Sequence, residues 1–183
     1  MSKSIKKRVL ESVMTSVMCI LGPITMVVPM SPVPISLFSF VVYITLYVLG
    51  RKSTTISCCL YLLIGATGIP VFSNFTGGAG IVFGPTGGYL IGYIFMAQIG
   101  GWFLEKFPKN RYMQVLGMIS GTVCCYFFGT AWLVYQSRVS VLQAVFMGVL
   151  PFVVFDFIKI LLAYYVGNIL RKRYKVFSHH HSF

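Results

Sequence analysis

Acidic side chains are almost missing from this sequence, which has 183 residues but only three Asp and Glu, namely Glu11, Glu105 and Asp156. Charged residues of both signs make up 10% of the chain, whereas a soluble domain has about 25%. Hydrophobic residues make up 57%, and the mean hydropathy is +0.83. This composition excludes an ordinary soluble protein and predicts a single integral membrane domain over residues 1–175. Residues 176–183 are expected to be a tail, either a tag remnant or a natural end.

Residues that perform catalysis or hold metals are also scarce. The three histidines, 179–181, follow the last apolar segment, so the spans contain no Ser-His-Asp or Cys-His set for nucleophilic catalysis. The sequence has no Walker A phosphate loop. Its five cysteines lie in apolar segments without metal-ligand spacing and are interpreted as small buried hydrophobes. We therefore expect no enzymatic activity, no metal and no organic cofactor.

Six apolar segments predict an all-α membrane protein with six transmembrane helices, over 9–28, 35–50, 53–72, 87–104, 112–136 and 142–170. Of the 15 basic residues, 13 lie before the first segment, after the last, or in the second-to-third and fourth-to-fifth connections. The positive-inside rule then predicts that both termini are cytoplasmic. The net charge of +12 is therefore a topology signal, and no nucleic-acid partner is expected.

Two opposite charges, Asp156 and Lys159, lie inside the last apolar segment. A charge near the middle of a span costs roughly 2.5–3.5 kcal/mol even on lenient insertion scales. Their spacing places both on one helix face, where each partly neutralises the other. Two interpretations stay open. In the first, the pair is a ligand site: Asp156 accepts N–H bonds, and Lys159 either holds Asp156 ionised or attracts a ligand carboxylate. In the second, the ion pair only fixes helix packing.

A glycine-rich connection, residues 73–88, is the second candidate for a ligand site. It has six glycines and no charge, and such backbone at membrane depth persists only inside protein or beside a cavity. Asn74 suits an amide-like ligand, or else it caps a helix or bonds its own loop. Gly77 and Gly78 allow close approach of a ligand to the backbone. Tyr89 is expected either in a ligand pocket or in the interfacial aromatic belt.

Ser12 and Ser16 form a small-xxx-small pattern in the first apolar segment. Such patterns allow close helix contact, either with another protein or within the chain.

Taken together, the motifs at 29–35, 63–72, Gly84-Pro-Thr-Gly-Gly-Tyr89 and Asp156-x-x-Lys159 closely resemble the BioY family. Its members are biotin-specific substrate-binding (S) components of energy-coupling factor (ECF) transporters. The resemblance covers residue 9 to about 175. It implies a six-helix S-component bundle in a bacterial cell membrane, a high-affinity site for biotin, and a transmembrane coupling subunit and two cytoplasmic ATPases as partners.

The resemblance also implies roles for single residues. Asp156 and Asn74 correspond to polar contacts with the ureido ring, and Lys159 corresponds to a partner of either Asp156 or the biotin carboxylate. Tyr89 and the glycines Gly77 and Gly78 correspond to pocket walls, and residues 29–34 to a lid. Ser12 and Ser16 stand nearest to the Ala-xxx-Ala ridge with which many S components dock on the coupling subunit.

A self-sufficient secondary carrier for biotin or another small vitamin is the alternative. Such carriers usually contain paired internal repeats with broken helices in both halves. This sequence has one glycine-rich interruption without a second copy, which favours the binding subunit.

Overall fold

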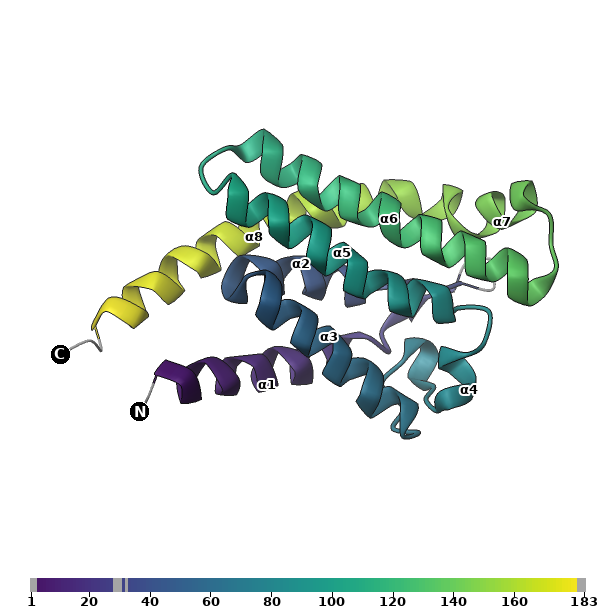
Figure 1. Ribbon diagram of the computed structural model, residues 1–183, viewed down its shortest axis with the longest axis horizontal. Coiled ribbons are helices and arrows are strands. Elements are labelled where there is room, and N and C mark those ends of the chain that lie inside the picture. Colours follow the sequence, from purple (N-terminus) through teal and green to yellow (C-terminus); the bar gives the residue numbers. More distant parts are fainter. Residues whose placement is uncertain (1–2, 28–30, 32, 181–183) are drawn as a thin grey trace.

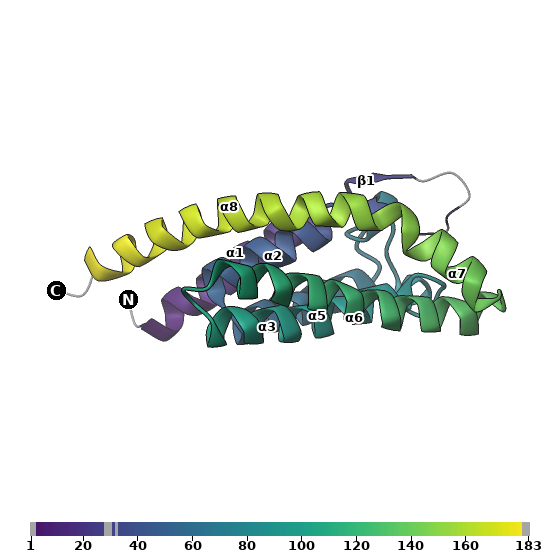
Figure 2. The same ribbon diagram turned by 90° about the horizontal axis from the view of Figure 1, so that it is seen from above.

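The chain is largely helical. The computed structural model describes residues 3–27, 31 and 33–180. The longer helices run along one axis of the molecule (Figures 1 and 2): α1 (Lys3–Leu21), α2 (Phe38–Leu49), α3 (Arg51–Ala66), α5 (Gly87–Lys106), α6 (Arg111–Ser137), α7 (Val141–Gly148) and α8 (Leu150–His180). Shorter elements are the strands β1 (Thr25–Met26) and β2 (Ile35–Ser36), the 3-10 helix η1 (Ser73–Phe75) and helix α4 (Ala79–Val82).

The two ends of the bundle differ. Both chain termini and the α2–α3 and α5–α6 connections lie at one end, which we call the terminal end (Figure 1). The short antiparallel ladder of β1 and β2, together with α4 and α7, lies at the opposite end, which we call the loop end (Figure 2). The irregular segments predicted from proline and glycine therefore gather at one end of the molecule.

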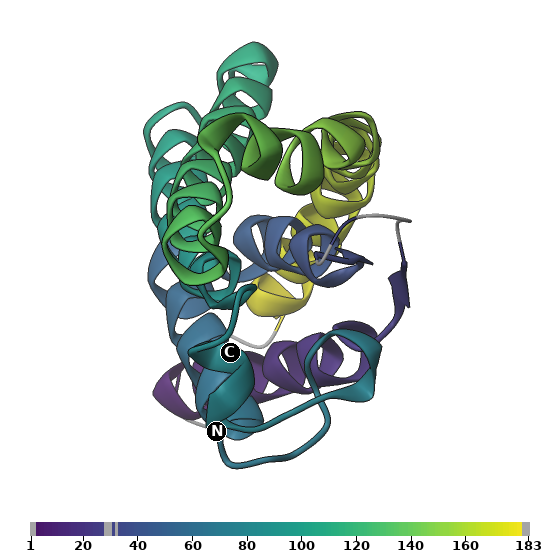
Figure 3. The same ribbon diagram turned by 90° about the vertical axis from the view of Figure 1, so that its right-hand side faces the viewer.

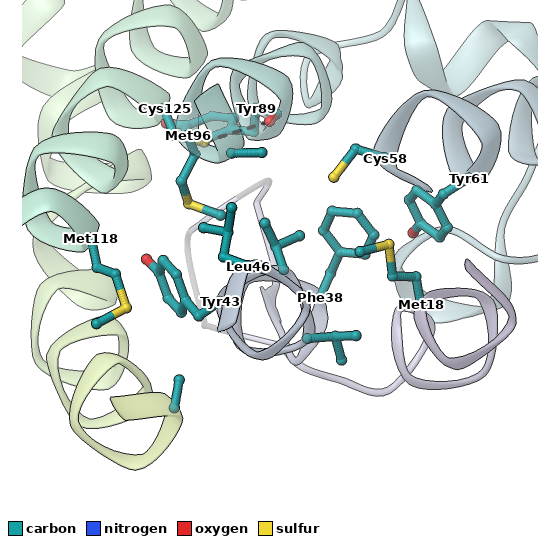
Figure 4. Close-up of a cluster of buried hydrophobic side chains, with 14 of the residues drawn as sticks. Met18, Phe38, Tyr43, Leu46, Cys58, Tyr61, Tyr89, Met96, Met118 and Cys125 are labelled. Carbon is teal, nitrogen blue, oxygen red and sulfur yellow. Dashed lines mark hydrogen bonds between the residues drawn. The ribbon is translucent and has the colours of Figure 1, made fainter. Parts of the chain in front are cut away.

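Helix α2 lies in the middle of the bundle, where it packs against α1, α3, α5 and α8 (Figure 3). Its side chains Phe38 and Tyr43 are 2% and 0% exposed. Phe38 stacks on Tyr61 of α3 with ring centroids 4.2 Å apart, and Met18 of α1 lies beside them (Figure 4). Tyr43 points the other way, toward Met118 of α6 (Figure 4). This short helix therefore forms the centre of the hydrophobic core.

The outer surface is apolar. Phe127 on α6 is 69% exposed and Val154 on α8 is 65% exposed. Large exposed apolar surfaces of this kind are typical of contact with lipid. Within the described part of the chain, two helical stretches are long and apolar enough, by length and composition, to cross a membrane: Arg111–Ser137 and Val141–Arg171.

Two of the predicted segments end earlier as helices than expected. The first ends at Leu21 instead of residue 28, directly before Gly22 and Pro23. The third ends at Ala66 instead of residue 72, and Gly68 follows with a φ of 103°. This left-handed conformation suits glycine and ends a helix. Residues 22–27 and 67–72 instead lie in the turns and short elements at the loop end of the bundle.

The segment predicted as a transmembrane helix over 142–170 is one apolar stretch, but it consists of two helices rather than one. The segment bends between α7 and α8 at Val149, whose φ and ψ are −128° and −59°. Pro151 explains the break, because it has no N–H to give to the carbonyl of Met147 and proline is tolerated only in the first turn of a helix.

The carbonyl groups freed by this break have other donors. The Ser31 hydroxyl donates to the Met147 carbonyl at 2.7 Å. The Tyr89 hydroxyl donates to the Gly148 carbonyl at 3.0 Å. Buried carbonyl groups rarely lack partners, so these two bonds stabilise the bend and place the start of α8 against the interior.

Candidate functional site

A buried ion pair on α8 lies at the centre of the candidate site. Asp156 and Lys159 are only 8% and 9% exposed, and Lys159 Nζ lies 3.0 Å from Asp156 Oδ1. The pairing expected from their spacing is therefore present. Because both side chains are buried among the helices, each charge requires partners from the protein.

Neighbouring elements supply those partners. Lys159 Nζ donates to the backbone oxygen of Ser36 in β2 at 2.7 Å and to Ser39 Oγ of α2 at 3.1 Å. Ser39 Oγ also lies 3.3 Å from Asp156 Oδ1, and the Tyr126 hydroxyl of α6 donates to Asp156 Oδ2 at 2.6 Å. An ammonium group has three hydrogens. Those of Lys159 are therefore all engaged, whereas the Asp156 carboxylate keeps acceptor capacity.

Two adjoining cavities lie next to this network. The inner cavity, of about 30 Å³, touches the ion pair, and the outer cavity, of about 200 Å³, touches Asn74. Val33, Pro34, Tyr89 and Tyr93 line both. A volume of 30 Å³ suits one or two water molecules, whereas small-molecule sites usually measure about 300–1,000 Å³. A vitamin-sized ligand that contacts the ion pair must therefore widen the inner cavity.

Asn74 lies in η1 with a φ of 57°, a left-handed conformation that asparagine tolerates. Its side-chain oxygen accepts a hydrogen bond from Thr25 Oγ1 of β1, and its backbone N–H donates to the Pro23 carbonyl at 3.2 Å. These contacts tie the glycine-rich connection to the end of α1. Within the described part of the chain, no protein acceptor is found for its amide nitrogen, so two N–H donors are available to a ligand.

Gly77 and Gly78 line neither of these two cavities. A Cβ on Gly77 would lie 2.3 Å from the Ile69 carbonyl oxygen, and Gly78 has a φ of 104°. The Gly78 N–H donates to the Gly65 carbonyl at 2.7 Å. Both positions require glycine for the path of the loop against the end of α3, and their contact with a ligand stays a prediction.

Tyr89 is 6% exposed and lies at the start of α5, so it is buried and not part of a lipid-facing aromatic belt. Its ring packs on Gly129, where an added Cβ would lie 2.3 Å away. The same side chain lines both cavities and donates to Gly148. It therefore connects the cavity wall with the bend between α7 and α8.

Three further side chains belong to the site but were not predicted. Tyr93 lies one helical turn after Tyr89 on the same face of α5, and this spacing is a sequence signal that identifies it. Ser39 and Tyr126 come from other helices. No local pattern marks them, because only the packing of α2 and α6 against α8 brings them to the ion pair.

Ser12 and Ser16 are exposed on α1 and line neither cavity. Their hydroxyls donate to the helix carbonyls of Arg8 and Ser12, at 3.1 and 3.0 Å. An outward-facing position leaves both side chains open to contact with another protein, and docking stays a prediction.

The predicted lid over 29–34 lies partly outside the described residues, namely at 29, 30 and 32. Of its other members, Val33 and Pro34 line both cavities.

Comparison with known proteins gives a consistent result. The sequence profile described as the BioY family matches residues 1–176. The chain is 39% identical over 145 residues to the biotin transporter BioY of Thermotoga maritima, covering 79% of this chain and 85% of that protein. It is 32% identical over 152 residues to the biotin transporter BioY2 of Lactococcus lactis subsp. cremoris, covering 83% and 82%.

A solved structure shares the fold. The crystal structure of the S-component for biotin from an ECF-type ABC transporter superposes with a TM-score of 0.86 at 30% identity. The match covers 94% of this chain and 95% of that one.

Proposed function

Because the chain belongs to the BioY family, we propose that it is the high-affinity biotin-binding membrane subunit of an ECF-type vitamin uptake transporter. The observation that carries the proposal is the buried pair Asp156–Lys159 beside two tyrosine-walled cavities. Intramembrane charges tend to mark substrate pathways, and a pocket needs only a few polar groups to orient its ligand.

Each part of biotin has a matching group at this site. Asp156 Oδ1 and Oδ2 have remaining acceptor capacity for the ureido N–H groups. The amide nitrogen of Asn74, which has no acceptor among the described residues, is a donor for the ureido oxygen. Tyr89, Tyr93 and Phe152 give the thioether ring and the aliphatic chain apolar walls. Gly77 and Gly78 line neither cavity in this structure, and we propose that they contact the ligand once the cavity widens.

Lys159 had two proposed roles, as partner of Asp156 or of the biotin carboxylate. The three donors of its ammonium group already have acceptors in Ser36, Ser39 and Asp156. A ligand carboxylate would have to displace one of them. We therefore assign Lys159 to pairing with Asp156 and fixing its orientation.

The topology proposed from the charges suits the two ends of the bundle. The termini and the α2–α3 and α5–α6 connections, which carry most of the basic residues, share the terminal end (Figure 1). Under the positive-inside rule this end is cytoplasmic. The chain then crosses the bacterial cell membrane six times, with α7 and α8 as one bent span, and the cavities lie toward the outer side.

Transport would require partners, namely a transmembrane coupling subunit and two cytoplasmic ATPases. The exposed Ser12 and Ser16 on α1 are the proposed contact with the coupling subunit, because their small side chains and internally bonded hydroxyls allow close helix approach. A carrier that works alone is the competing proposal, and biotin uptake by cells lacking the ATPases would favour it.

The first experiment is calorimetric titration of the purified protein with biotin, with desthiobiotin and thiamine as controls. We expect saturable submicromolar binding of biotin and no binding of thiamine. Asp156→Asn should weaken biotin binding by at least about 2 kcal/mol, because it removes a buried charged acceptor. Glu105→Gln is the matched control, because it makes the same change at an exposed carboxylate of α5 that pairs with Arg51. Unchanged affinity in Asp156→Asn would contradict the ureido assignment.

A further inference from the structure

A large apolar groove runs along the outside of the bundle between α6 and the α7–α8 segment. Its volume is about 790 Å³, and its walls include Val123, Phe127, Val145 and Phe157. Phe127 is 69% exposed and Val123 is 59% exposed, so the groove opens to the surroundings of the protein. In a membrane those surroundings are lipid acyl chains.

Among the residues that the structure describes, three line both this groove and the inner cavity, namely Thr122, Tyr126 and Asp156. The substrate cavity is therefore separated from the lipid-facing groove by a wall one side chain thick. Asp156 faces the groove at this wall, where an ionised carboxylate without a polar partner is costly.

Tyr126 is the member of this wall that acts on Asp156. Its hydroxyl donates to Asp156 Oδ2 at 2.6 Å, while Lys159 and Ser39 lie on Oδ1. Helix α6 therefore holds Oδ2, through Tyr126, and α8 and α2 hold Oδ1, through Lys159 and Ser39. Thr122 has a different role, because its hydroxyl bonds to the Met118 carbonyl and to Tyr43.

We propose that Tyr126 is a positioning residue for the substrate site: its hydroxyl fixes the Asp156 carboxylate, and its ring seals the inner cavity against the lipid-facing groove. This inference rests on the proposed role of Asp156 in biotin binding. The hydroxyl and the ring are separable by substitution, which gives two independent measurements.

The hydroxyl is tested with Tyr126→Phe, which keeps the ring. We expect the dissociation constant for biotin to rise about tenfold or more, as for loss of a hydrogen bond to a charged group. Tyr135→Phe on the same helix is the matched control, because Tyr135 is 78% exposed. Loss of this buried hydrogen bond should also lower the melting temperature of Tyr126→Phe by several degrees, so both variants are titrated at a temperature where each is folded. An unchanged or higher affinity in Tyr126→Phe overturns the positioning role.

The seal is tested with dicyclohexylcarbodiimide, a bilayer-soluble reagent that reacts with the protonated form of a carboxyl group. Labelling is therefore carried out at mildly acidic pH and is read as the adduct on Asp156 or as its amide cross-link to Lys159, whose amine lies 3.0 Å away. The chain has only three acidic side chains, so peptide mass mapping separates Asp156 from Glu11 and Glu105. In lipid vesicles, Tyr126→Ala should increase the labelling rate of Asp156 several-fold, whereas Phe127→Ala, which only widens the groove, should not. Equal rates in the two variants overturn the seal.

The same measurements distinguish failure of the proposed biotin-binding function from failure of the role proposed for Tyr126. If the unmodified protein does not bind biotin, or if Asp156→Asn binds it equally well, the substrate assignment fails. If both of those results are as expected and Tyr126→Phe alone behaves like the unmodified protein, only the role of Tyr126 fails.

Discussion

Removing one charge of the Asp156–Lys159 pair should be far more harmful than removing both. In Lys159→Met, Asp156 keeps only the neutral donors Ser39 and Tyr126. Breaking a buried ion pair in this way costs about 3–5 kcal/mol. At about 2–4 °C per kcal/mol for a chain of this size, the apparent melting temperature in detergent should fall by roughly 6–20 °C.

The double variant Asp156→Leu/Lys159→Met should restore stability without restoring binding. Replacing a whole buried pair by apolar side chains is often neutral or stabilising, by up to about 1–4 kcal/mol. Its melting temperature should therefore be near that of the unmodified protein. Biotin binding should be lost, because the acceptor for the ureido N–H groups is gone.

Two assays on the same samples separate these effects. Unfolding is followed by the reaction of a thiol-reactive dye with Cys58 and Cys125, which are 0% and 3% exposed. Biotin binding is measured by calorimetry at a temperature where each variant is folded. Wild-type affinity in the stable double variant would show that the pair serves packing alone. A single variant as stable as the unmodified protein would refute the energetic argument.

Two further predictions concern other parts of the molecule. Ser12→Leu or Ser16→Leu should leave biotin binding unchanged but abolish co-purification with the coupling subunit. The control Val154→Leu on α8 should change neither biotin binding nor co-purification. Loss of biotin binding in the serine variants would point to a packing role for the serines. Gly148→Ala should lower the free energy of unfolding by about 1–3 kcal/mol, because the new Cβ would lie 2.0 Å from the Tyr89 hydroxyl oxygen. Gly80→Ala, with open space around it, is the control in thermal unfolding. Equal melting temperatures of the two variants would contradict the close packing of Tyr89 on Gly148.

The sequence predicts helix positions well where an apolar segment is long and is not interrupted by proline. The fourth and fifth segments, over 87–104 and 112–136, agree with α5 and α6 within two residues at each end. The bend at Val149 was missed because hydropathy is insensitive to it, although Pro151 marks it. The ends of α1 and α3 were set too late for the same reason, since apolar residues continue past the glycines that end each helix.

The site is only partly visible in the sequence. Asp156 and Lys159 stand out because charge is rare in an apolar segment, and their pairing follows from helix geometry. Their partners Ser39 and Tyr126 are 117 and 30 residues away from Asp156 in sequence. The chain has 11 tyrosines, so composition does not single out Tyr126, and no local pattern marks Ser39. Only the tertiary packing of α2 and α6 against α8 identifies them.

The small inner cavity has a kinetic consequence. At about 30 Å³ it does not admit a vitamin, so side chains that line it, such as Tyr89 and Tyr93, must first move apart. Binding that needs such a rearrangement is slower than binding to a cavity that is already open. The same barrier slows release. Once captured, the ligand would remain bound for long enough to meet a partner that arrives rarely.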